Sequence, residues 1–153
     1  MDDQSCELPV SNASTEEIDG ILSTATTIAV VGLSDNPERE SHKVASYLQA
    51  RGYRIVPVNP ALREVLGERS YPNLAAIPSE IAVDVVDVFR RTEFIPAVVD
   101  AAIARRAGAV WMQLGLVHNA SAERARAAGL RVVMDRCMKV EHARWSAPHG
   151  DGR

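Results

Sequence analysis

Short apolar segments alternate with segments of helical periodicity along most of this 153-residue chain. Because strands that are separated by helices usually pair in parallel, the alternation predicts an α/β fold with a doubly wound parallel sheet of about five strands. Helices would cover both faces of the sheet, in three layers, α/β/α. The predicted strands are rich in β-branched residues and lie at 27–33, 53–60, 82–89, 109–115 and 130–135.

The helical segments carry their own stop signals. Gly52, Gly108 and Gly129 end three of them, and Asn119 is a candidate cap for one. Residues 61–80 are irregular and are interpreted as turns with one short helix. Helices are predicted over 15–24, 40–52, 91–108, 119–129 and 138–145.

The chain length fits one domain, which we expect over 15–145, between a flexible N-terminus at 1–14 and a flexible tail at 146–153. A net charge of −3 without a basic stripe argues against a nucleic-acid partner. No run approaches the ~20 apolar residues of a membrane helix, and no signal peptide is visible, so a cytoplasmic protein is expected. Cys6 and Cys137 are not expected to form a disulfide there.

The loop after the first predicted strand is the first candidate for a binding site. In doubly wound sheets, ligands bind beyond the carboxyl ends of the strands, where the strand order reverses. Gly32 lets the backbone bend, Ser34 and Ser41 can donate hydroxyl hydrogen bonds, and Ser41 lies where the next helix is expected to begin. Free amides at a helix start favour an anion such as phosphate. The cations near this site are Arg39, Lys43 and Arg90.

Standard nucleotide-binding and catalytic motifs are incomplete in this chain. A dinucleotide fingerprint needs glycines where Ser34 and Pro37 stand, and an acidic residue where the second strand ends in Asn59. The loop also lacks the glycine and lysine of a P-loop, and Asp35 and Asn36 break the pattern of a nucleophile elbow. Since these motifs are incomplete, we predict no catalytic constellation. The histidines and cysteines do not have metal-ligand spacing either, so we predict no metal site.

Several singled-out residues also have structural interpretations. Gly32 can simply end a strand, Ser34 and Ser41 can satisfy nearby amides or cap a helix, and the lysine and arginines of the loop can be solvated. The remaining expectations are Trp111 in the core, His142 on a helix surface, His118 in a loop near the cleft, and Cys137 as either a reactive thiol or a buried small hydrophobe.

Four blocks of the sequence together resemble a known family. They are VVGLSDNPERESHKVASYLQARGYRIVPVNP, DVVDVFRR, VWMQLGL and VVMDRCMKVEH, and they fall in order at the predicted strand ends, within about residues 20–145. They are similar to the small stand-alone CoA-binding proteins, which look like the nucleotide-binding domain of the succinyl-CoA synthetase α subunit. The resemblance implies a Rossmann-like fold that binds coenzyme A (CoA) or an acyl-CoA, without a settled reaction.

The resemblance also implies a role for each block. The first loop would hold the phosphates of the ligand, through Gly32, Leu33, Ser34, Pro37, Arg39, Ser41 and Lys43. The adenosine end would be lined by Val58, Asn59 and Pro60, and the opposite wall would be formed by Val88, Phe89 and Arg90. The pantetheine arm would lie near Gln113 and Gly115.

These observations predict a CoA-binding or regulatory module without catalysis of its own. The chain shows no counterpart of the catalytic histidine domain of the synthetase, so the ligase chemistry is not expected. One alternative is a small enzyme acting on an acyl-CoA through Asp35, Glu38, His118 or Cys137, and another is a divergent NAD(P) binder. Cys137 could also form a mixed disulfide with the thiol of CoA. A homodimer or an unknown protein partner is possible, and no membrane partner is expected.

Overall fold

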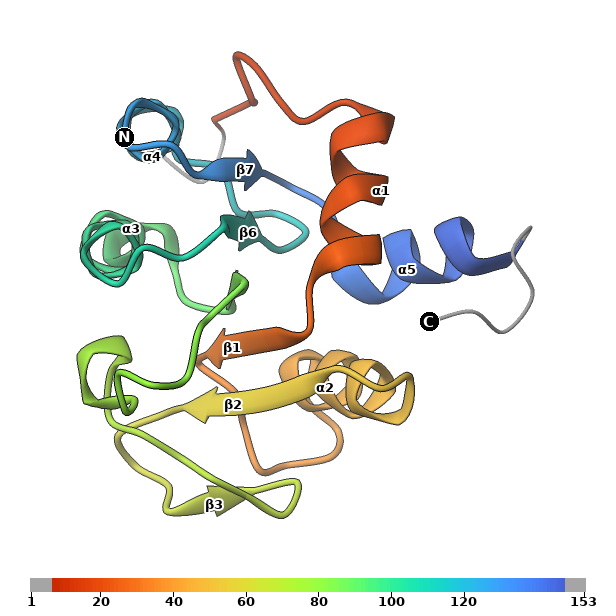
Figure 1. Ribbon diagram of the computed structural model, residues 1–153, viewed down its shortest axis with the longest axis vertical. Helices are drawn as coiled ribbons and strands as arrows, with labels where there is room; N and C mark the ends of the chain where they lie inside the picture. The colour runs from red at the N-terminus through yellow and green to blue at the C-terminus, as the bar shows by residue number, and fades with distance from the viewer. Residues whose placement is uncertain (1–6, 148–153) are drawn as a thin grey trace.

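A parallel five-stranded sheet forms the centre of the computed structural model, which describes residues 7–147. The strands lie side by side in the order β2-β1-β5-β6-β7, as Figure 1 shows. This confirms the predicted α/β fold, because each predicted strand occurs and pairs in parallel. The strand bounds are Thr27–Val31 for β1, Arg54–Val58 for β2, Val85–Val88 for β5, Ala109–Met112 for β6 and Arg131–Val133 for β7.

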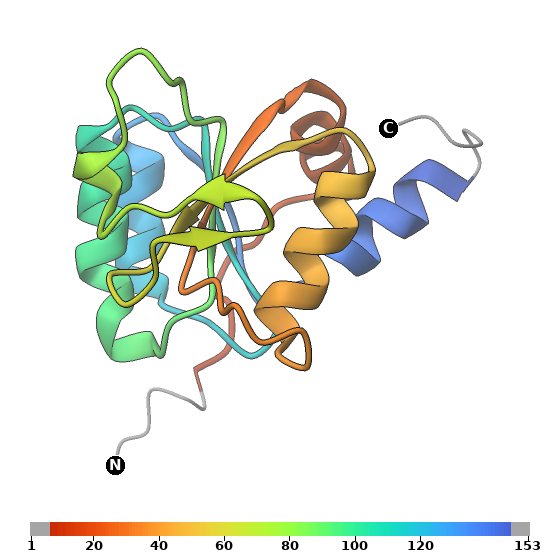
Figure 2. The ribbon, with the colours of Figure 1, turned by 90° about the horizontal axis from the view of Figure 1, so that it is seen from below.

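Helices cover both faces of the sheet, as the two views in Figures 1 and 2 show. Helices α3 and α4 lie on one face, and α1, α2 and α5 lie on the other. One apolar core fills the space on each side of the sheet, so the strands are buried on both faces. The helix bounds are Thr15–Thr24 for α1, Glu40–Ala50 for α2, Ile95–Ala104 for α3, Asn119–Ala127 for α4 and Met138–Ser146 for α5.

Helix starts follow local capping chemistry. Ser14 and Glu17 form a capping box at α1, and the predicted range 15–24 is confirmed. The prediction of Asn119 as the cap of α4 is wrong. His118 occupies that position, and its Nδ1 accepts a hydrogen bond of 3.2 Å from the Ser121 amide. The Asn119 side chain instead accepts one from the Val10 amide, since it lies beside the N-terminal segment.

The irregular stretch at 61–80 contains the predicted short helix and, in addition, a hairpin that was not predicted. A small hairpin joins β3, Glu64–Val65, to β4, Glu68–Arg69, and a 3₁₀ helix, η2, follows at Leu74–Ala76. The hairpin turns at Leu66 and Gly67, which both have positive φ. The remainder of the stretch is turns, as expected, and it packs beside the carboxyl end of β2.

Trp111 and His142 are both buried, although only Trp111 was predicted to be in the core. Trp111 is in the core, as predicted, and its Nε1 donates to the Arg136 carbonyl at 2.8 Å. The prediction of His142 on a helix surface is wrong, because its ring is fully buried. It hydrogen-bonds the Tyr47 hydroxyl at 3.0 Å and meets Tyr53 and the Tyr47 ring edge-on. Helix α5 packs against α1 and α2, which covers the face that carries this histidine.

The N-terminal segment at 7–14 lies along the open edge of β7. The Asn12 side chain both donates to the Met134 carbonyl, at 2.8 Å, and accepts from the Met134 amide, at 2.9 Å. Cys6 and the tail at 148–153 lie outside the described residues. Within the part of the chain that the structure describes, no helix is long and apolar enough to cross a membrane.

Candidate functional site

The chain order of the sheet reverses between β1 and β5. From β1 the chain moves outward to β2, and it then returns past β1 to form β5. The loops that follow β1 and β5 therefore run toward opposite faces of the sheet and leave a crevice beyond these two strand ends, which is the usual ligand position in such sheets. Two pockets lie at these ends, and they share two lining residues, Phe89 and Arg90.

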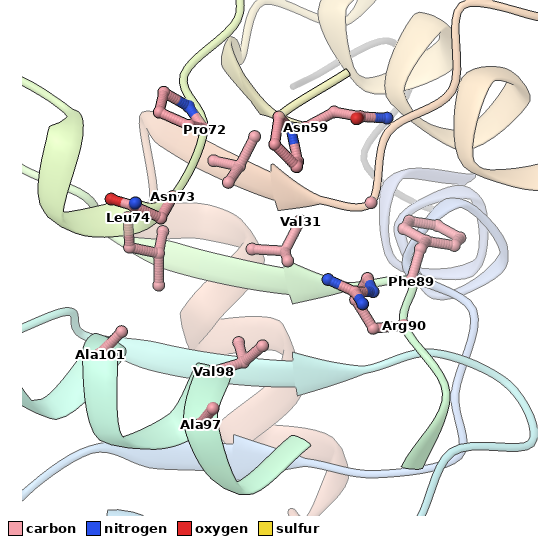
Figure 3. Close-up of a pocket in the computed structure, with 13 residues that line it drawn as sticks. Val31, Asn59, Pro72, Asn73, Leu74, Phe89, Arg90, Ala97, Val98 and Ala101 are labelled. Atoms are coloured by element: carbon pink, nitrogen blue, oxygen red, sulfur yellow. The ribbon is translucent and has the colours of Figure 1, made fainter. Parts of the chain in front are cut away.

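The first pocket has a volume of about 540 Å³ and lies on the α3 side of the sheet. Figure 3 shows its walls, with Val98 and Ala101 of α3 facing the end of β1 and Arg90 at one side. Its polar groups are few, and its walls are largely apolar, as in many small-molecule sites. It is lined by Val31, Gly32, Val58, Asn59, Pro60, Pro72, Asn73, Leu74, Phe89, Arg90, Ala97, Val98 and Ala101.

The second pocket has a volume of about 480 Å³ and lies on the α2 and α5 side. Its apolar wall comes from Val44 of α2 and from the loop after β6, and Cys137 lies at its edge where α5 begins. It is lined by Glu40, Val44, Phe89, Arg90, Arg91, Gln113, Leu114, Leu116 and Cys137.

Gly32 is needed where the ends of β1 and β5 meet. Its φ is +89°, and a Cβ at this position would lie 2.5 Å from the Phe89 carbonyl oxygen. Its amide donates to the Val58 carbonyl at 2.9 Å. Gly32 therefore lines the first pocket, but its own N–H is already used by the chain.

The loop that follows Gly32 is held mainly by its own hydrogen bonds. The Ser34 hydroxyl accepts from the Asn36 amide, and the Ser41 hydroxyl accepts from the Ser34 amide, both at 3.0 Å. Ser41 is buried in the first turn of α2, and the capping position belongs to Arg39. Both hydroxyls thus serve the turn, and each keeps one O–H that can still donate.

The predicted cations of this loop point to the surface. The Lys43 side chain is 48% exposed and lies 3.8 Å from the Glu40 carboxylate. Eight of the fifteen predicted binding residues line neither pocket: Leu33, Ser34, Pro37, Arg39, Ser41, Lys43, Val88 and Gly115. Leu33 and Val88 are buried in the core.

Arg90 is the cation shared by both pockets. Its guanidinium lies 4.0 Å above the Phe94 ring, which fixes its direction. Among residues 7–147 it forms no ion pair, whereas its neighbour Arg91 lies 3.5 Å from Glu93. The guanidinium therefore has donors available at the junction of the two pockets.

Asn59, at the end of β2, uses its side-chain amide for hydrogen bonds within the fold. Asn59 Nδ2 donates to the Leu33 carbonyl at 3.0 Å, and its Oδ1 accepts from the Ala61 amide at 2.9 Å. Asn59 ties the loop after β1 to the end of β2. Val58 and Pro60 flank it in the wall of the first pocket.

The loop after β6 places Gln113 in the second pocket. The residue is 5% exposed, and its Oε1 accepts from the Met138 amide at 3.1 Å. Gly115 turns away, because its amide donates to Asp135 Oδ1 at 2.7 Å.

Part of the first pocket was missed by sequence reasoning. Its wall at Pro72, Asn73 and Leu74 comes from the irregular stretch, which Arg105 holds in place. The Arg105 guanidinium donates to four backbone carbonyls, at distances from 2.6 to 3.1 Å, on Leu74, Ile77, Pro78 and Ile81. No pattern in a single sequence marks such contacts, although the apolar positions of α3 were visible as a helical face.

The residues considered for acid–base or nucleophilic chemistry are not joined to one another. No hydrogen bond within residues 7–147 links Asp35, Glu38, His118 and Cys137, and His118 is engaged in capping α4. No group of three or more potential metal ligands occurs in the described part of the chain either.

One buried acid lies beneath the site without a partner. Asp87, on β5, is fully buried between Val30 of β1 and Trp111 of β6. Neither carboxyl oxygen has a hydrogen-bond partner among the described residues. Burial raises the pKa of Asp87 well above its ordinary value, so the carboxyl stays neutral over a wider pH range.

Comparison with known proteins identifies the family. The sequence model of the CoA-binding domain matches residues 26–143, which include all five strands of the sheet. The chain belongs to the CoA-binding domain family. Membership in this family supports CoA binding in general. YneT of Bacillus subtilis (strain 168), described as uncharacterized, is 42% identical over 134 residues, which are 88% of this chain and 98% of YneT.

Solved structures share the fold of this CoA-binding domain. A hypothetical protein from Pyrococcus horikoshii OT3 is 36% identical, with a TM-score of 0.84, over 95% of this chain and 99% of that one. The dinucleotide forming acetyl-coenzyme A synthetase 1 of Ca. Korarchaeum cryptofilum is 23% identical, with a TM-score of 0.63, over 72% of this chain and 26% of that one. The second similarity is one of fold alone.

Proposed function

We propose that this chain binds CoA or an acyl-CoA across the carboxyl ends of β1 and β5, as a binding or regulatory module without turnover of its own. The nucleotide end lies in the first pocket and the pantetheine arm in the second. The observation that supports this arrangement most is the junction itself, since Phe89 and Arg90 line both pockets. A long ligand with a charged middle fits two apolar pockets joined at an unpaired guanidinium.

The fit of the described residues to CoA supports the proposal. Both volumes, about 540 and 480 Å³, lie within the usual range for small-molecule sites. Arg90 offers a fork of donors suited to a diphosphate. At the end of β2, where a dinucleotide binder offers a carboxylate to the ribose, Asn59 has an amide that the chain already uses. This favours CoA over NAD(P).

Replacement of Arg90 by alanine tests the proposal. We expect the dissociation constant for CoA, measured by calorimetry, to rise at least tenfold, which corresponds to the roughly 1.5–3 kcal/mol of a charge-assisted hydrogen bond. Arg91→Ala is the matched control, because Arg91 pairs with Glu93, and it should change the affinity far less. Absence of binding by CoA, acetyl-CoA and dephospho-CoA to the unaltered protein at millimolar concentration would rule the function out. Binding of NADH in their place would select the NAD(P) alternative.

Lys43 and Arg39 remain proposed ligands of the CoA phosphates. To contact a phosphate, Lys43 would leave its ion pair with Glu40. Lys43→Glu should then weaken CoA binding by roughly 1.5–3 kcal/mol. An unchanged affinity would assign Lys43 to the solvated surface of α2.

A further inference from the structure

Cys137 occupies a capping position without acting as a cap. It precedes α5, a helix of nine residues, and its side chain makes no capping hydrogen bond. The thiol is free and half-buried, and the residue lines the second pocket. Its backbone N–H has no hydrogen-bond acceptor within residues 7–147. The residue thus presents a thiol and a backbone donor at the edge of the pocket.

Gln113 supplies an independent sign that this pocket receives a carbonyl oxygen. The residue is 95% buried, as its exposed fraction of 5% shows. The Met138 amide, one residue beyond Cys137, donates to Gln113 Oε1 at 3.1 Å, and this contact fixes which end of the side-chain amide faces α5. The other end, the Nε2 amino group, has no acceptor among the described residues, although Gln113 lines the pocket. Its N–H groups are therefore available to an acceptor in the pocket.

We infer that Cys137 accepts the acyl group of an acyl-CoA bound in the proposed site, so this inference rests on the proposed function. Cys137 Sγ attacks the thioester carbonyl carbon, and a new thioester bond forms as the bond to the CoA sulfur breaks. Cys137 gives its thiol proton to water, and the departing CoA sulfur takes a proton from water. The products are S-acyl-Cys137 and free CoA, and no oxidant or reductant is needed.

The two unpaired donors fit this step better than a disulfide exchange. A carbonyl oxygen becomes negatively charged during thioester attack, and N–H donors from Gln113 and from the Cys137 backbone stabilise such an oxygen. A disulfide sulfur is a poor acceptor and would leave both donors unused. The apolar wall formed by Val44, Phe89 and Leu116 selects a short, uncharged acyl group such as acetyl or butyryl.

The test measures the intact mass of the protein after incubation with butyryl-CoA, together with the CoA released. We expect one acyl group per chain, mapped to Cys137 by peptide analysis and removed by hydroxylamine. Cys6→Ser is the matched control and should be acylated normally. Cys137→Ser should lose the modification. Binding of CoA to the unaltered protein, measured separately by calorimetry, reports on the proposed function and so separates it from this inference.

Gln113→Glu tests the donor without removing the contact to α5. A glutamate keeps an oxygen for the Met138 amide but has no amino group, so the acylation rate should fall roughly a hundredfold. Its melting temperature should stay close to that of the unaltered protein.

The outcomes separate the two claims. Acyl-CoA that binds without modifying Cys137, or acylation at the same rate in urea-unfolded protein, would overturn the inference and leave the proposed function in place. A mixed disulfide formed with CoA disulfide, without acyl transfer from butyryl-CoA, would also overturn it. Failure of every CoA species to bind would overturn both.

Discussion

At Gly32 the strand end allows no side chain. Two effects act there, since φ is +89° and a Cβ would meet the Phe89 carbonyl oxygen. Gly32→Ala should lower the free energy of unfolding by about 2–4 kcal/mol and weaken CoA binding, because β1 and β5 must separate. Gly129→Ala isolates the conformational effect, since φ there is +94° and nothing lies within 4 Å. Urea denaturation that shows equal losses for both variants would refute the close contact.

Asp87 makes stability depend on pH in an unusual direction. Its pKa is raised by burial in the folded chain, whereas the pKa of an ordinary aspartate is 3.8. Between these two values the unfolded state releases a proton that the folded state keeps, so stability falls as the pH rises. Asp87→Asn removes this dependence. Its stability relative to the unaltered protein should therefore increase with pH, by up to about 1.4 kcal/mol per pH unit, in urea unfolding between pH 5 and 8.

The control for Asp87 is an exposed acid. Asp100→Asn removes a carboxylate on the surface of α3, where its ion pair with Arg124 is solvated. The free energy of unfolding of Asp100→Asn should change with pH in nearly the same way as that of the unaltered protein over this range. Parallel profiles for Asp87→Asn as well would mean that Asp87 is ionised in the folded state.

Secondary-structure elements with strong local chemistry could be predicted from the sequence. Helical periodicity predicted α1, which begins at the capping box of Ser14 and Glu17, and β-branched runs predicted all five strands of the sheet. The hairpin at 64–69 could not be predicted, because its strands have two residues each and consist mainly of charged ones. His142 was misplaced for another reason. Its burial depends on where α5 docks, which the periodicity of nine residues does not determine.

Only part of the candidate site could be predicted, because some of its residues follow directly from the strands and others are positioned by long-range contacts. Residues directly beyond strand ends, such as Phe89 and Arg90, could be named because strand ends converge in a parallel sheet. The wall at Pro72, Asn73 and Leu74 could not, because long-range hydrogen bonds from Arg105 position it.

Arg105 is a positioning residue for the stretch that precedes β5. Its four carbonyl contacts hold the wall of the first pocket from a distance, and the residue itself lines a different surface. Arg105→Ala should lower the free energy of unfolding by about 2–3 kcal/mol, since it leaves carbonyls unpaired, and should weaken CoA binding. Hydrogen exchange should become faster at 72–81.

Two control variants show whether the four hydrogen bonds of Arg105, rather than its positive charge, hold this stretch. Arg105→Lys keeps the charge but cannot reach all four carbonyls, so it should restore only part of the stability. Arg106→Ala, at the adjacent exposed position, should change neither property. Slow exchange at 72–81 in Arg105→Ala would show that this wall is held in another way.

At the scale of the whole molecule, the two pockets lie on opposite sides of one sheet. The first adjoins the core beneath α3 and α4, and the second adjoins the core beneath α2 and α5. At the reversal between β1 and β5 a single ligand can contact both sides without crossing a strand. The topology thus explains why an extended ligand suits this fold.

This arrangement predicts that the two halves of CoA bind separately. Adenosine 3′,5′-bisphosphate should bind in the first pocket and pantetheine in the second, each far more weakly than CoA, since joining two ligands raises their effective concentration. Val98→Trp fills the first pocket from α3, and Leu114→Trp narrows the second from the loop after β6. In calorimetry Val98→Trp should no longer bind the bisphosphate but should still bind pantetheine, and Leu114→Trp should do the reverse. Both variants should bind CoA more weakly. If either variant affected the two halves equally, the ligand would occupy one pocket rather than span two.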